Sequence, residues 1–168
     1  LVDDGQDVTP GDTLLMAYGP AQSLLTCERI MLNFIQLLSG TASIARLYVE
    51  AISGTSAMIL DTRKTVPGLR TAQKYAVAVA GAKNHRMGLF DAYLIKENHI
   101  AAVGGIAESI YAARTQNPHI KIEIEVETIP QLLEALEAGV DMVLLDNFSP
   151  KDLREAVTLN TGNVPLEA

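Results

Sequence analysis

The first third of the chain carries apolar residues at helical spacing. From residue 28 to about 52 the apolar positions fall three or four residues apart, which predicts an amphipathic helix. Ser39 and Gly40 lie in the middle of this segment, and we expect them to break or kink it. Residues 1–20 instead hold turn dipeptides between short apolar stretches, which predicts β-hairpins.

Beyond Gly54 another pattern repeats: a short apolar stretch ends in polar residues, and a segment with helical spacing follows. We expect strands at Ala57–Leu60, Ala92–Ile95, Ile122–Val126, Met142–Leu145 and Val164–Leu166. Helices are predicted over roughly 70–80, 104–116, 129–138 and 150–158. Pro130 and Pro150 fall where first helical turns are expected, and Gly139 falls where a helix C-cap belongs.

This alternation of strands and helices is typical of βαβ units and predicts a parallel sheet. No glycine-rich dinucleotide fingerprint follows the first strand, which favours a (β/α) barrel over a doubly wound sheet. A full eight-stranded barrel needs about 250 residues, and this chain has 168. The predicted fold class is therefore α/β, with an incomplete (β/α) barrel.

Composition narrows the class of protein further. The chain is 48% hydrophobic, which excludes a disordered protein. It has no run of 18 or more apolar residues and no signal peptide, so we expect a soluble protein without a membrane partner. The single cysteine, Cys27, excludes an intramolecular disulfide and fits a cytoplasmic location. The chain begins without Met and ends within a predicted strand, so we expect it to be truncated at both ends.

The charge distribution indicates a small anionic ligand. The net charge of −7 argues against nucleic acid as a partner. Seven of the thirteen basic residues nevertheless fall between positions 61 and 96, against two acidic ones. They are Arg63, Lys64, Arg70, Lys74, Lys83, Arg86 and Lys96. For Lys74 and Lys83, a solvated position on a helix is an equally good interpretation.

Each predicted strand ends in charged residues, and in a (β/α) barrel these ends share one rim where ligands bind. Arg63 can bind a carboxylate through two parallel hydrogen bonds, while Lys64 is a compact charge. Glu125 and Asp146 suit ribose hydroxyls, or a Mg²⁺ ion that bridges a pyrophosphate. A ligand with a sugar, phosphates and carboxylates would use both sets.

The three histidines differ in their context. His85 stands beside Arg86 in the basic segment, which favours contact with a ligand. His119 follows a proline between a helix and a strand and is expected at the surface. For His99 the structural and functional interpretations are balanced.

Several strings resemble the quinolinate phosphoribosyltransferase family, in family order and with family-like spacing. They are Glu28-Arg29, Leu32-Asn33, Leu38-Ser39-Gly40, the run from Asp61 to Arg70 (DTRKTVPGLR), Gln73–Val77, Asn84-His85-Arg86, Leu94–His99 and Leu144–Asn147. The Asp61-Thr62-Arg63-Lys64-Thr65 stretch is highly specific by itself. The resemblance covers most of the chain, from about residue 24 to the end.

The resemblance implies an N-terminal α/β sandwich domain, of which residues 1–27 are the end, and a barrel domain over residues 28–168. It also implies a homodimer in which one subunit completes its neighbour's site. The family's glycine-rich turns for the 5′-phosphate would lie beyond Ala168, so the sequence does not assign that site.

The implied substrates are quinolinate and phosphoribosyl pyrophosphate with Mg²⁺, and the implied product is nicotinate mononucleotide for NAD synthesis. Carried over residue by residue, the quinolinate carboxylates would meet Arg63, His85, Arg86 and Lys96, with Arg29 donated by the partner subunit. Lys64 would approach phosphoribosyl pyrophosphate, and Glu125 and Asp146 the ribose or its Mg²⁺, so these three are the candidate catalytic residues.

Three alternatives remain open at this point. The chain could belong to a phosphoribosyltransferase for another heterocyclic acid, or it could be a non-catalytic fragment that binds the ligand without turnover. A purely structural βα domain is the third, and it does not explain why five ligand-type residues share one short basic segment.

Overall fold

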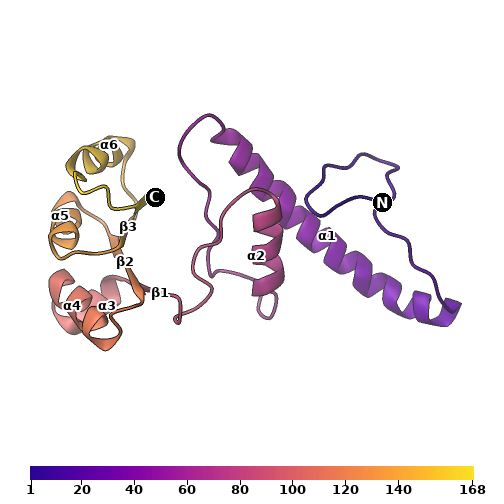
Figure 1. Ribbon diagram of the computed structural model, residues 1–168, viewed down its shortest axis with the longest axis horizontal. Helices are drawn as coiled ribbons and strands as arrows, with labels where there is room; N and C mark the ends of the chain where they lie inside the picture. The colour runs from indigo at the N-terminus through magenta and orange to yellow at the C-terminus, as the bar shows by residue number, and fades with distance from the viewer. The chain divides into compact units, whose positions relative to one another are not determined.

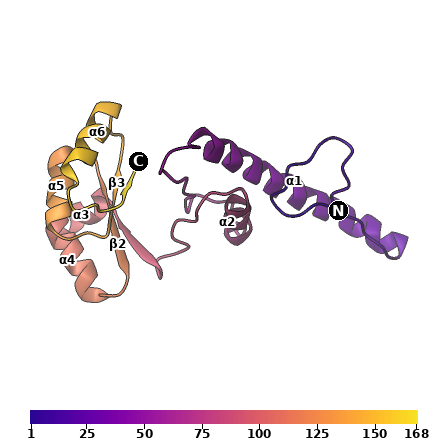
Figure 2. The same ribbon diagram turned by 45° about the horizontal axis from the view of Figure 1, so that its top comes forward.

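The chain forms six helices and one four-stranded sheet, divided between two units. The computed structural model describes residues 1–168; the first unit is Leu1–His85 and the second is Arg86–Ala168. Figures 1 and 2 show the ribbon in two views. Each unit is described by itself below.

The long helix α1 (Ala21–Ala51) dominates the first unit, and it is continuous. The expected break at Ser39 and Gly40 is therefore wrong. A glycine inside a helix costs only about 1 kcal/mol relative to alanine, and the helix continues through this position. By length and composition α1 could cross a membrane, but core helices of soluble proteins pass the same test, so this feature is weak evidence.

The N-terminal residues 1–20 contain no strand, so the predicted hairpins are wrong. The turn signals do produce turns: the N–H of Gln6 donates to the carbonyl of Asp3, and that of Asp12 to the carbonyl of Thr9. Short hairpins without further strands are marginal in water, and no sheet is present in this unit for them to join.

Helix α2 (Arg70–Val79) packs against α1, as both ribbon views show. The strand expected at Ala57–Leu60 is reduced to one parallel bridge between Leu60 and Lys83. That prediction fails because a single apolar run forms a strand only where a neighbour extends the ladder. The bridge nevertheless fixes residues 59–61 beside residues 83–85.

The second unit has the predicted parallel architecture, with sheet order β1-β2-β3-β4. The strands are β1 (Ala92–Ile95), β2 (Lys121–Val126), β3 (Met142–Leu145) and β4 (Leu166–Glu167). The helices are α3 (Glu97–Val103), α4 (Ile106–Gln116), α5 (Ile129–Glu137) and α6 (Pro150–Leu159). Strands and helices alternate as predicted, although the short helix α3 was not foreseen.

The helices of this unit cover one face of the sheet (Figures 1 and 2). Ile122, Ile124 and Val126 of β2 point into the core on that face. Because successive strand residues point to opposite sides, Glu123 and Glu125 lie on the other face. The alternation along β2 therefore separates an apolar core from a face of the sheet that carries carboxyl groups.

The predicted helix ends are confirmed. The hydroxyls of Thr128 and Ser149 accept the N–H groups of Gln131 and Asp152 at the starts of α5 and α6, each of which carries a proline in its first turn. Gly139 has φ +76° directly after α5, a conformation that glycine adopts without strain.

Candidate active site

The carboxyl ends of β1, β2 and β3 bring three of the predicted site residues to one edge of the sheet. Lys96 follows β1, Glu125 lies near the end of β2, and Asp146 follows β3. The register pairs Ile95 with Ile124, so Lys96 and Glu125 are neighbours across the two strands. The N–H of Asp146 donates to the carbonyl of Val126 at 2.9 Å, which extends the ladder by one residue.

Lys96 and Glu125 form an ion pair. The side chain of Lys96 is 43% exposed and that of Glu125 is 12% exposed, so the pair is open to solvent on the lysine side. The carboxylate of Asp146 accepts a hydrogen bond from the Asn147 amide at 2.8 Å. A cation and two carboxylates thus stand together at the strand ends, and oxygen donors of this kind suit hydroxyl groups or Mg²⁺.

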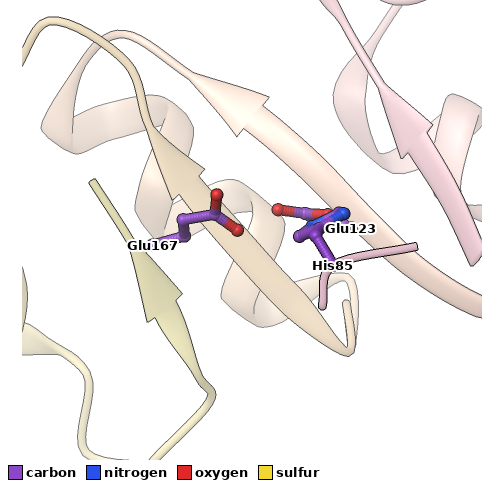
Figure 3. A group of neighbouring side chains, drawn as sticks. All are labelled: His85, Glu123 and Glu167. Atoms are coloured by element: carbon purple, nitrogen blue, oxygen red, sulfur yellow. The ribbon is translucent and has the colours of Figure 1, made fainter. Parts of the chain in front are cut away.

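Two further carboxyl groups lie on the face of the sheet that carries Glu125. The carboxyl groups of Glu123 and Glu167 point toward one another (Figure 3) and are hydrogen-bonded. Burial, the charge of Glu167 and that hydrogen bond raise the pKa of Glu123 to about 8, while the positive charge of Arg86 opposes the rise. Glu123 therefore keeps its proton at neutral pH.

Arg86 itself belongs to a tightly closed loop. Its Nη1 donates to the carbonyl of Ala92 at 3.4 Å, at the start of β1. The carboxylate of Asp91 accepts the N–H groups of Met87 at 2.7 Å and Gly88 at 3.1 Å. Burial disfavours the charged form of Asp91, but these backbone hydrogen bonds outweigh it and lower the pKa of Asp91.

In the first unit, the loop that carries Arg63 and Lys64 is held by helix α2. The guanidinium of Arg70 donates to the carbonyl of Arg63 and to the hydroxyl of Thr65, each at 3.2 Å. The Nε of Arg63 is buried and has no hydrogen-bond partner, whereas Lys64 is exposed. Buried donors are nearly always satisfied, so the orphaned Nε indicates a place for a ligand oxygen.

The backbone of His85 is held at both of its polar groups. Its N–H donates to Asp61 Oδ1 at 2.8 Å, and its carbonyl accepts from Lys74 Nζ at 2.9 Å. Asp61 and Lys74 also form an ion pair, with side chains only 7% and 1% exposed. With its amide nitrogen turned inward, Asn84 donates to Asp61 Oδ2 at 2.8 Å and to the carbonyl of Lys74 at 2.9 Å. The interpretation of Lys74 as a solvated helix lysine is therefore wrong. Lys83 is exposed, as that interpretation expects, but it lies in the bridge with Leu60 and not on a helix.

The remaining candidates have simpler surroundings. Arg29 is exposed on α1. His99 Nδ1 accepts the backbone N–H of Lys96 at 3.0 Å and so caps α3, which gives it a structural role. His119 is exposed, as predicted.

Sequence reasoning gave no site role to Asp61, Lys74, Asn84, Glu123 or Glu167. For Glu123 a signal existed, because the alternation Ile122-Glu123-Ile124-Glu125 places both glutamates on the face opposite the core. For Lys74 no such signal existed, because a lysine on a helix is normally solvated.

Two family models together match nearly the whole chain. The model described as quinolinate phosphoribosyl transferase, C-terminal domain, matches residues 41–168, and the N-terminal domain model matches residues 1–39. The chain belongs to the quinolinate phosphoribosyltransferase family. The resemblance seen in the sequence motifs is thereby confirmed.

Individual relatives of this family are similar over almost all of the chain. A probable nicotinate-nucleotide pyrophosphorylase (carboxylating) of Bacillus subtilis is 45% identical over 98% of the chain and 57% of its own length. The human nicotinate-nucleotide pyrophosphorylase (carboxylating) is 38% identical with the same coverage of both proteins, 98% and 57%. The crystal structure of a NadC deletion mutant superposes with a TM-score of 0.94 at 46% identity, covering 98% of the chain and 59% of that structure. The α/β fold with a parallel sheet therefore matches that of solved NadC structures, and the chain spans a little over half the length of these relatives.

Proposed function

We propose that this protein transfers the phosphoribosyl group of phosphoribosyl pyrophosphate to quinolinate, with loss of CO2, to give nicotinate mononucleotide and pyrophosphate. Family membership supports this reaction class, and the curated relatives bear names of the same enzyme. The observation that carries the proposal is the row of Lys96, Glu125 and Asp146 at adjacent strand ends. This row offers a cation for a carboxylate beside oxygen acceptors for a ribose.

The proposed roles follow the chemistry of each side chain. Arg63, His85, Arg86 and Lys96 bind the two carboxylates of quinolinate, and the buried, unsatisfied Nε of Arg63 supports its place in this set. Lys64, which is exposed, approaches the phosphates. Glu125 and Asp146 accept from the ribose hydroxyls.

In the first chemical step, the pyridine nitrogen attacks the anomeric carbon and the bond to pyrophosphate breaks. Positive charge develops on the ribose, and the carboxylates of Glu125 and Asp146 stabilise it electrostatically. In the second step the 2-carboxylate leaves as CO2, its bonding electrons remain on the ring, where the pyridinium accepts them, and the ring carbon takes up a proton. The protein's contribution is positioning and charge, so no nucleophilic side chain takes part.

Mg²⁺ fits this site because Glu125 and Asp146 offer hard oxygen donors at neighbouring strand ends. When bound with phosphoribosyl pyrophosphate, the ion would neutralise charge on the departing pyrophosphate. These two carboxylates are the residues that would face it.

The active form is proposed to be a cytoplasmic homodimer in which Arg29 reaches the partner's acid site. The exposed position of Arg29 and the apolar side chains exposed along α1 support an interface there. These side chains include Leu25, Ile30, Phe34, Leu37, Ile44 and Leu47. Exposed apolar surface of this extent is typical of a contact between chains.

A product assay on the protein at its native length tests the proposal. Quinolinate, phosphoribosyl pyrophosphate and Mg²⁺ should yield nicotinate mononucleotide with one CO2 per turnover, whereas nicotinate should be a poor substrate. Equal turnover of nicotinate would favour a phosphoribosyltransferase for another heterocyclic acid. Calorimetric binding of quinolinate without any product would favour a binding protein without turnover.

A further inference from the structure

The most deeply buried charges of the first unit surround a main-chain segment instead of a ligand pocket. Lys74 and Asp61 are almost fully buried, and each makes one of its contacts to the backbone of His85. The ammonium holds the carbonyl oxygen and the carboxylate holds the N–H. Both polar groups of one peptide residue are therefore fixed by a single ion pair.

The position of these contacts in the sequence matters. Asp61 immediately precedes the loop with Arg63, and His85 immediately precedes Arg86. The parallel bridge between Leu60 and Lys83 brings the two segments side by side, and Asn84 ties Asp61 to helix α2. The ion pair thus lies where the two segments that carry the predicted acid-binding residues are joined.

Stability alone does not account for such a pair. Removing two charges from water has a large cost, and a buried ion pair can often be replaced by apolar residues without loss of stability. A buried pair that holds a specific backbone conformation has a different use, because it fixes one geometry among several of similar energy. Here that geometry is the direction in which the His85 side chain leaves the backbone.

We propose that Asp61 and Lys74 are positioning residues for acid binding: the pair clamps the backbone of His85 so that its imidazole meets a carboxylate of quinolinate. This proposal rests on the proposed function, since it assigns His85 to the acid site. Asp61 and Lys74 touch the backbone and not the substrate, so they act through His85.

The test uses the double variant Asp61→Asn/Lys74→Met in the protein at its native length. Both substitutions nearly preserve shape and leave no unpaired charge, and the amide oxygen introduced at position 61 can still accept the His85 N–H. What the variant loses is the ammonium donor to the His85 carbonyl and the second acceptor oxygen at position 61, which receives the Asn84 amide. We expect a melting temperature close to wild type and a KM for quinolinate raised roughly ten- to a hundredfold, as small misplacements of binding groups produce. The KM for phosphoribosyl pyrophosphate should change less than about threefold.

A merely structural pair would give another result: a lower melting temperature and less active protein, with an unchanged KM for quinolinate. Lys83→Met is the matched control, because Lys83 is exposed and lies two residues before His85. This control should match wild type in both KM values. If the double variant does not fold, Asn84→Ala is measured instead. We expect a smaller rise in the quinolinate KM for this variant. An unchanged quinolinate KM would overturn the proposal.

Binding is also measured without turnover. Nuclear magnetic resonance of histidine-labelled protein follows the imidazole signals, and the signal that disappears in His85→Gln is assigned to His85. The His85 signal should shift with quinolinate, and its half-saturation should move at least tenfold in the double variant. If the wild-type enzyme makes product and the double variant binds quinolinate as tightly as wild type does, the clamp is overturned and the proposed function stands. A wild-type protein that binds no quinolinate would overturn the proposed function, and the clamp with it.

Discussion

Lys96 and Glu125 form an ion pair across the adjacent ends of β1 and β2, although their proposed ligands differ. Lys96 is assigned to the acid and Glu125 to the ribose. In the protein without ligands, each therefore neutralises the other. The pair also sets the spacing between the two proposed subsites, because both residues are anchored by the register of the sheet.

The two partners should respond differently to substitution. Lys96→Met should weaken quinolinate binding by tens-fold or more, since loss of a desolvated charged contact costs roughly 2–5 kcal/mol. Glu125→Gln should leave quinolinate affinity unchanged or slightly increased, because it releases Lys96, and should lower kcat by roughly a hundredfold. Calorimetry with quinolinate and steady-state kinetics measure the two effects. Equal loss of quinolinate affinity in both variants would contradict this division.

Arg63→Ala should lose quinolinate affinity by roughly 30-fold to several thousandfold, because a charged contact in a desolvated site is removed. Arg63→Lys should also be strongly impaired, since an ammonium does not reproduce the planar two-bond contact with a carboxylate. The buried Nε without a partner motivates both expectations. Binding is measured by calorimetry, and circular dichroism verifies the fold.

Lys64→Arg is the companion to these variants, because the two cations are adjacent in the sequence and differ in exposure. It should retain quinolinate affinity and change mainly the KM for phosphoribosyl pyrophosphate. If Arg63→Lys and Lys64→Arg both keep full activity, the two residues are generic charges and the assigned roles fail.

If Arg29 serves the neighbouring subunit, two inactive variants should rescue each other. A mixed dimer of Arg29→Ala and Lys96→Ala subunits has one site without either substitution. After random subunit exchange, mixing should restore about a quarter of the wild-type activity, because half of the dimers are mixed and each has one intact site. No recovery, with exchange proven by a tagged subunit, would place Arg29 in its own subunit's site or outside any site.

The sequence predicted the second unit well because its signals are local. Short apolar runs that end in polar residues, capping hydroxyls and a C-cap glycine each act over a few residues, and they located β1, β3 and the starts of α5 and α6. The predictions failed where partners decide the outcome. Residues 57–60 read as a strand, but only Leu60 has a neighbour to pair with.

The candidate site shows the same division. The charges at strand ends could be found because polar residues that end apolar runs are visible in the sequence. The buried role of Lys74 could not, because a lysine on a helix is normally solvated and its partner Asp61 is distant in sequence. Only the packed structure shows that a carboxylate and a backbone carbonyl accept hydrogen bonds from its ammonium group.

The Glu123–Glu167 pair leads to a prediction about stability and pH. In the folded protein the pKa of Glu123 is about 8, against 4.5 for an ordinary glutamate. The folded state therefore holds more protons than the unfolded state between these values, and stability must fall as pH rises through this range. As pH rises, Glu123 ionises first in the unfolded chain. In the folded protein, burial and the charges of Glu167 and Glu125 keep Glu123 protonated to higher pH, although the charge of Arg86 has the opposite effect.

Urea unfolding at pH 5, 6, 7 and 8, in the absence of divalent ions, measures this dependence. Wild-type protein should show a midpoint that decreases steadily across the series. Glu123→Gln keeps the shape and a hydrogen-bond donor toward Glu167 but has no proton to lose, so its midpoint should change less and should exceed that of wild type at pH 8. Glu127→Gln is the matched control, because Glu127 is exposed just after the same strand, and it should retain the wild-type slope. Parallel pH profiles for wild type and Glu123→Gln would mean that Glu123 is ionised in the folded protein, and its raised pKa would have to be abandoned.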